Sequence, residues 1–220
     1  MKKVQSHKDG IVLINRLKKD LEFKVSDGES KTFVIFLTDG KDQIGDLKII
    51  IDGKAANVQI LGVILGYGTQ NINLYSLQDH LKPESASDFL IKTVLFDRAR
   101  FHYQGLIRIE KCAQKSNAYL KNQNLIMSKS AKVNSRPFLE IQADDVHCTH
   151  GVTIGKIDKD KLYYLATRGL DQKSASKLLI MGFLSVVLDR IPDDSIRHHL
   201  QAQLVNKIDT LIRNKNINYV

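Results

Sequence analysis

The apolar residues of this chain change their spacing once along its length, and that change limits the possible folds more than any other feature. From about residue 9 to 155 the pattern is typical of β-strands. Short runs rich in Val, Ile, Leu and Phe occur at 32–37, 47–51, 58–65, 89–96 and 101–109. Asp-Gly pairs at 27–28, 39–40 and 52–53 predict tight turns in the first third, between short antiparallel or edge strands. We therefore expect a mainly β core.

The strands expected between about residue 70 and 155 follow one another closely, with Asn, Ser and Gly between them. No helix-length segment separates them, apart from the charged stretch 78–87. A parallel sheet without crossover helices has few solutions, and one is a β-helix, in which each coil stacks on the one before. The coil length in the sequence is irregular, and a β-sandwich fits the pattern nearly as well. Periodicity leaves both architectures open.

After residue 157 the spacing of the apolar residues becomes helical, and polar residues mark the helix ends. Asp158 can cap a first helix that ends at Gly169, a residue suited to the left-handed conformation beyond a helix. Asp171 can cap a second helix, which Pro192 ends. A third helix is expected to start at 193–194. The segment therefore predicts three helices in succession.

The second and third of these helices each carry an apolar face. In the second the face comprises Ala175, Leu178, Leu179, Phe183, Val186 and Val187. In the third it comprises Ile196, Leu200, Leu204, Ile208, Leu211 and Ile212. Such a stripe usually packs against the same domain. We expect a β core over residues 1–157 and a small helical domain over 158–220.

The formal net charge of +9 makes nucleic acid the first partner to consider. The basic residues are nevertheless spread along the chain. The densest cluster, within 16–19, is broken by Leu17 and followed at once by Asp20 and Glu22. Aromatic residues make up 7% of the chain and are not interleaved with basic ones, as a surface that stacks bases requires. A solvated basic surface is favoured, and a basic nucleic-acid-binding β protein is the alternative.

Several classes of protein are disfavoured by what the sequence lacks. Two cysteines, Cys112 and Cys148, cannot form the disulfide framework of a small secreted domain, so a cytoplasmic location is expected. The longest apolar run, 178–188, is too short to span a bilayer. The glycines at 62, 66 and 68 are not followed by Gly-Lys-Ser/Thr, so no phosphate loop is expected. No Ser-His-Asp, His-Glu-x-x-His or Cys-x-x-Cys arrangement occurs either, and we expect no stand-alone enzyme.

The junction between the β region and the helices carries a dense series of motifs. Residues 136–170 read RPFLEIQADDVHCTHGVTIGKIDKDKLYYLATRGL. In order, the segment contains Pro before Leu-Glu-Ile, then Ala-Asp-Asp-Val, Cys-Thr-His-Gly, Thr-Ile-Gly and finally Arg-Gly. This order resembles the junction in the SufD/SufB family of iron–sulfur cluster assembly scaffolds. Residues 113–116, 122–125 and 182–183 are also similar to the family, so the resemblance covers about residues 95–190.

The resemblance implies a fold and a set of partners. The core would be a right-handed parallel β-helix followed by helices. The β-helix would pair with a SufB-like subunit or a second copy of this chain, and the complex would build a nascent, transient iron–sulfur cluster. The C-terminal helices would dock a SufC-type ABC ATPase, without nucleic acid or membrane as a partner. The expected docking residues are Arg168, Gly169, Leu170, Leu178, Leu179 and Phe183.

Cys148 and His150 are the candidate metal ligands. Residues two apart on a strand share a face, so this pair lies with Val146, Val152 and Ile154. Cys148 could be a buried small hydrophobe, or its thiol pKa could be lowered by a neighbouring imidazolium. The resemblance implies that His150 lies at the cluster-building interface, where the pair would supply part of a cluster site and a partner subunit the rest.

Two departures from the family pattern refine this expectation. SufB-type members carry a cysteine at the position where this chain has Asn122, so the chain is SufD-like rather than the principal sulfur-accepting type. The long N-terminal extension of the family is also largely missing. We expect a minimal member of the family, and the sequence leaves open whether it forms a homodimer or a heterodimer.

Overall fold

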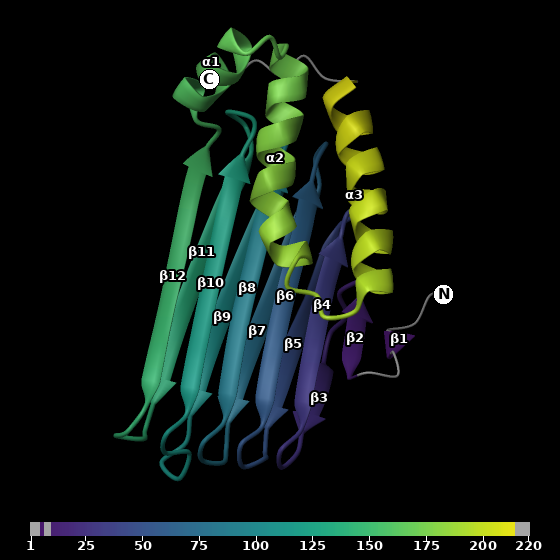
Figure 1. Cartoon of the computed structure of the whole chain (residues 1–220). Helices are drawn as coiled ribbons and strands as arrows, with labels where there is room; N and C mark the ends of the chain where they lie inside the picture. The colour runs from purple at the N-terminus through teal and green to yellow at the C-terminus, as the bar shows by residue number, and fades with distance from the viewer. Residues whose placement is uncertain (1–4, 7–9, 214–220) are drawn as a thin grey trace.

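A computed structural model describes residues 5–6 and 10–213, in which twelve strands form two sheets (Figure 1). Sheet A contains β1 (Gln5–Ser6), β2 (Ile11–Ile14), β4 (Ser30–Leu37), β6 (Asn57–Gly66), β8 (Ala86–Leu95), β10 (Asn117–Ile126) and β12 (His147–Lys156), in that order. Sheet B contains β11 (Lys132–Ile141), β9 (Arg100–Ile109), β7 (Asn71–His80), β5 (Gln43–Ile51) and β3 (Leu21–Val25). All neighbouring strands are parallel except β1 and β2. The antiparallel strands suggested by the Asp-Gly pairs are therefore not found, because those turns connect strands of different sheets.

From β2 onward, successive strands alternate between the two sheets, so the chain winds as a parallel β-solenoid of about five turns. The register shows the length of each coil. Along sheet A, Ser30 pairs with Asn57, Asn57 with Ala86, Ala86 with Asn117 and Asn117 with His147, which are offsets of 27, 29, 31 and 30 residues. The predicted parallel β-helix is confirmed, and the sandwich alternative is excluded because its strands would be antiparallel.

The core of the solenoid consists of side chains that stack in columns between the sheets. One column runs through Phe33, Ile60, Phe89 and Leu120, all fully buried. Because successive strand residues point to opposite faces, every second residue contributes to this core. β5 shows that alternation: Gln43, Gly45, Leu47, Ile49 and Ile51 are buried and the residues between them are not.

Three helices follow the solenoid: α1 (Lys159–Thr167), α2 (Gln172–Leu188) and α3 (Asp194–Arg213). The predicted helix starts are confirmed, whereas α2 ends at Leu188, before Pro192. The carboxylate of Asp158 accepts hydrogen bonds from the first turn of α1, and that of Asp171 accepts one from Ser174 N–H. Gly169 has a φ of +87°, the left-handed conformation for which glycine is suited. Among the described residues, no helix is long and apolar enough to cross a bilayer.

Helices α2 and α3 lie over the outer face of sheet A (Figure 1). Their buried residues form one apolar cluster with strand residues such as Val34, Leu61 and Leu90. Strands β6 and β8 are therefore buried on both faces, which explains why they read as continuous apolar runs. The outer face of β12 is left uncovered by α2 and α3 (Figure 1), whereas Leu125 of β10 still packs against the cluster beneath the helices.

The structure corrects the predicted apolar face of α2. The buried residues of that helix are Ala175, Ser176, Ile180, Leu184, Val187 and Leu188. Leu178 and Val186 are instead 53% and 46% exposed. The face of α3 agrees with the prediction, with Leu200, Leu204, Ile208, Leu211 and Ile212 buried. The charged stretch 78–87 ends β7 and forms the turn into β8.

Candidate functional site

The solenoid ends on β11 and β12, the last strands of the two sheets. β11 pairs only with β9, and β12 only with β10, within the described residues. Each strand therefore presents a free backbone edge of ten residues. Pro137 lies in the middle of β11, which is a position that a proline occupies on an edge strand because it lacks an N–H donor.

The apolar core is exposed at this end of the solenoid. Leu139, Ile141 and Ile154 are 38%, 40% and 50% exposed, although each continues an inward-facing column. One coil earlier, the residues that stack under Leu139 and Ile141 are Ile107 and Ile109, both fully buried. The exposure arises because no further coil within the described part of the chain covers the last one. Terminal repeats of a solenoid usually need a cap for this reason.

Cys148 and His150 both belong to this last coil. His150 continues the column that contains Phe89 and Leu120, and Cys148 stacks on Ala118. The thiol is half-buried and packs against the core, whereas His150 is exposed. As predicted, Cys148 and His150 lie on the same face of β12. That face is directed toward the core at the open end of the solenoid.

Burial raises the pKa of the Cys148 thiol, and a backbone hydrogen bond from Ala118 opposes this only in part. In the isolated chain the thiol is held protonated rather than activated as a thiolate. Within residues 10–213, no group of three or more His, Cys, Asp or Glu side chains could hold a metal ion. This chain therefore brings two donor side chains together at the open end, and the other ligands of a cluster are not supplied by its described residues.

The predicted docking residues divide into two groups. Arg168, Gly169 and Leu178 are exposed. Leu170, Leu179 and Phe183 are half-buried, and the last two pack against the cluster beneath the helices. The Phe183 ring also lies 4.5 Å from Lys92 Nζ, measured to the ring centre.

Sequence reasoning missed part of the exposed apolar surface of the helices. Leu178, Gly182 and Val186 form an exposed stripe at four-residue spacing along α2. On α1, Tyr163 and Tyr164 are 73% and 57% exposed. The signal for the tyrosines was available in the sequence, because the two aromatic residues are adjacent in a short predicted helix and adjacent residues cannot both point to the same face.

Asn122 is a polar residue inside the solenoid. It is fully buried, its Oδ1 accepts a hydrogen bond of 2.6 Å from Asn124 Nδ2, and its own Nδ2 has no partner within the described residues. The core-facing position of Asn122 was predictable, because strand residues two apart share a face and Asn122 lies two residues after the buried Leu120 on β10.

The comparisons with known proteins agree with this geometry. The family model described as "SUF system FeS cluster assembly, SufBD core domain" matches residues 3–183, which include the solenoid, α1 and most of α2. The chain belongs to this SufBD family. It is 30% identical over 158 residues to the iron–sulfur cluster assembly protein SufD of Escherichia coli, covering 72% of this chain and 37% of that protein. It is 32% identical over 146 residues to SufD of Bacillus subtilis, covering 66% and 33%.

A chloroplast relative, protein ABCI7 of Arabidopsis thaliana, is 34% identical over 142 residues, covering 61% of this chain and 30% of that protein. The chain thus spans about a third of the length of the curated relatives it matches. Membership of the SufBD family, together with these SufD relatives, identifies a SufD-like protein.

Proposed function

We propose that this chain is a scaffold subunit of a SUF-type iron–sulfur cluster assembly complex, without catalytic activity of its own. In this proposal the open end of the solenoid pairs with another subunit, and the helices dock a SufC-type ABC ATPase. The observation that carries the proposal is the exposed core at the last coil, where Leu139, Ile141 and Ile154 face solvent beside two free strand edges.

A partner subunit would cover this end by two kinds of interaction. The free edges of β11 and β12 offer unpaired backbone donors and acceptors, which extended segments of another chain can pair with. The exposed leucine and isoleucines offer apolar area, whose removal from water favours association. The partner would be a SufB-like chain or a second copy of this one.

The same contact would enclose Cys148 and His150 between two subunits. A neutral imidazole can ligate iron directly, whereas the Cys148 thiol must first lose its proton. Because burial raises the pKa of Cys148, that loss would require the metal itself to stabilise the thiolate. We therefore assign His150 as the primary ligand from this chain and Cys148 as a secondary one. The nascent cluster would be held transiently, with its remaining ligands from the partner.

The cluster role is tested by a pair of histidine variants on one strand. His150→Ala is expected to lower the iron and sulfide content of the anaerobically reconstituted complex by about half or more, because it removes a metal ligand. His147→Ala is the matched control, since His147 is exposed on the opposite face of β12. Both variants should keep the circular dichroism spectrum of the original protein. Equal cluster content in the two variants would remove His150 from the site.

A further inference from the structure

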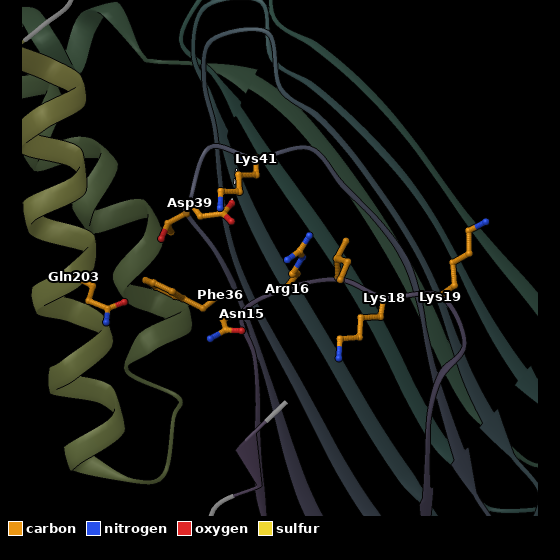
Figure 2. A pocket seen from close by; sticks show the side chains of 10 residues that line it. Asn15, Arg16, Lys18, Lys19, Phe36, Asp39, Lys41 and Gln203 are labelled. Carbon is orange, nitrogen blue, oxygen red and sulfur yellow. Dashed lines mark hydrogen bonds between the residues drawn. The ribbon is translucent and has the colours of Figure 1, made fainter. Parts of the chain in front are cut away.

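A cleft of about 700 Å³ opens at the first coil of the solenoid (Figure 2). Its walls are the β2–β3 loop (15–20), the β4–β5 loop (38–42) and helix α3, which contributes Gln203. In the strand order of sheet A, β2 and β12 lie near opposite ends. The cleft is therefore separate from the open end, where pairing is proposed.

The cleft is lined by more positive than negative charge. Arg16, Lys18, Lys19 and Lys41 line it, and Asp39 is the one carboxylate among the lining residues. None of the four cations forms an ion pair with another described residue. Figure 2 shows Arg16, Lys18 and Lys41 around the opening, whereas Lys19 points away from them. Because these cations have no acidic partner within residues 10–213, they create a positive potential that attracts anions.

Hydrogen bonds hold the two loops in place. The side chain of Gln43, which is 3% exposed, accepts a bond of 3.1 Å from Leu17 N–H and donates one of 3.3 Å to Asp39 Oδ1. The Asp39 carboxylate also accepts a bond of 3.1 Å from Lys41 N–H, so its charge is engaged by its own chain. A buried glutamine thus connects the loop that carries Arg16 and Lys18 to the loop that carries Lys41. Such preorganisation lowers the entropy lost on binding.

The β2–β3 loop is further fixed by a glycine of the neighbouring strand. The backbone of Lys18 lies directly over Gly45 of β5, and a Cβ atom at position 45 would collide with it. Asp46 N–H donates a hydrogen bond of 3.0 Å to Lys18 O at the same place. The loop can lie flat on β5 only because residue 45 has no side chain.

We infer that this cleft binds a small phosphate-bearing anion, such as a polyphosphate or a nucleotide. An arginine guanidinium matches the geometry of a phosphate group, and lysines add point charges. The cleft volume is within the range of small-molecule sites. Asn15 and Gln203 add amide groups on the side toward α3 (Figure 2). A nucleic-acid strand fits less well, because the aromatic residue at the cleft, Phe36, is only 4% exposed and offers no face for base stacking.

The proposal is tested by calorimetric titration of the full chain with tripolyphosphate at low salt. The double variant Arg16→Gln/Lys41→Gln is expected to raise the Kd about tenfold or more, because each lost charge-assisted hydrogen bond contributes on that scale. The control is Lys111→Gln/Lys129→Gln, two exposed lysines outside the cleft, with the same loss of net charge. It should leave the Kd within about twofold, since distant surface charges are screened. An equal rise in both variants, or no saturable binding, would overturn the inference.

A competition experiment distinguishes the possible ligands. ATP is expected to displace tripolyphosphate, and AMP to do so more weakly because it carries fewer charges. Gly45→Ala should also weaken tripolyphosphate binding by moving the β2–β3 loop, while the spectroscopic signature of the fold persists. A single-stranded oligonucleotide that binds more tightly than ATP, with affinity falling steeply as salt rises, would contradict a small-molecule site.

Discussion

His80 is a fully buried histidine at the end of β7, and both nitrogens of its ring are engaged by hydroxyl groups. Nδ1 shares a hydrogen bond of 2.8 Å with Ser85 Oγ, and Nε2 shares one of 2.7 Å with Ser87 Oγ. Burial lowers the pKa of His80 to about 4, and the nearby carboxylate of Asp79 only partly opposes this effect. The folded protein therefore holds this imidazole neutral.

The buried imidazole predicts a loss of stability in mild acid. The unfolded chain binds a proton at His80 near pH 6.5, but the folded chain does so only near pH 4. The contribution of His80 to the free energy of unfolding is therefore fully present above pH 6.5, the unfolded pKa. It is lost as the pH drops from 6.5 toward 4, by about 2 kcal/mol at pH 5. Urea unfolding at pH 7.5 and 5 measures it. His80→Gln removes the titrating group and should lack this component, and an unchanged pH dependence in that variant would refute the assignment.

At the scale of single residues, the sequence predicts which side chains share a strand face better than it predicts whether they are exposed. The shared face of Cys148 and His150 follows from strand geometry alone. That His150 is exposed at the end of a core column could not be predicted this way, because it depends on which coil is the last. The same holds for the cleft, where Arg16, Lys41 and Gln203 are far apart in the chain and meet only when coils stack and α3 packs over them.

At the scale of the element, α2 has two apolar sides. One side packs Ile180 and Leu184 against sheet A, and the other exposes Leu178 and Val186. The start of this helix was predictable from Asp171, whereas the helix ends at Leu188, before Pro192 is reached. The buried face was not predictable, because a helix with apolar residues on much of its circumference can pack in several orientations.

The exposed stripe of α2 predicts where the ATPase docks. Leu178→Glu/Val186→Glu should reduce capture of a SufC-type ATPase about tenfold or more, because a few apolar anchors dominate such contacts. Phe138→Glu is the control, an exposed apolar residue on the outer face of sheet B. Pull-down with purified proteins measures the effect.

Point variants are a cleaner test of docking than removal of residues 158–220. Deleting the helices would uncover the apolar outer face of β6 and β8 and destabilise the solenoid itself. If the α2 variant captured as much ATPase as the Phe138 variant, the exposed stripe would not be the docking surface.

At the scale of the whole molecule, the two ends of the solenoid differ in how far the core is exposed. Val12, Ile14 and Val25 of the first coil are buried, whereas Leu139, Ile141 and Ile154 of the last coil are 38%, 40% and 50% exposed. A mainly β core was predictable from the apolar runs, but coils of 27 to 31 residues are too irregular to separate a parallel solenoid from an antiparallel sandwich by spacing alone. The motifs at 136–170 favoured the solenoid over the sandwich, because they resemble a family whose members have a β-helix core.

The most direct test of the account is the mass of the assembled complex in solution, measured by light scattering or analytical ultracentrifugation. Ile154→Lys places a charge on the exposed core at the open end, while Ile44→Lys makes the same change at a residue of β5 that is equally exposed, at 53% against 50%. We predict that Ile154→Lys weakens subunit pairing by about 100-fold, because an unpaired ammonium would be buried, and that Ile44→Lys pairs normally. Unaltered pairing in the Ile154 variant, or equal loss in both, would contradict assembly through the open end.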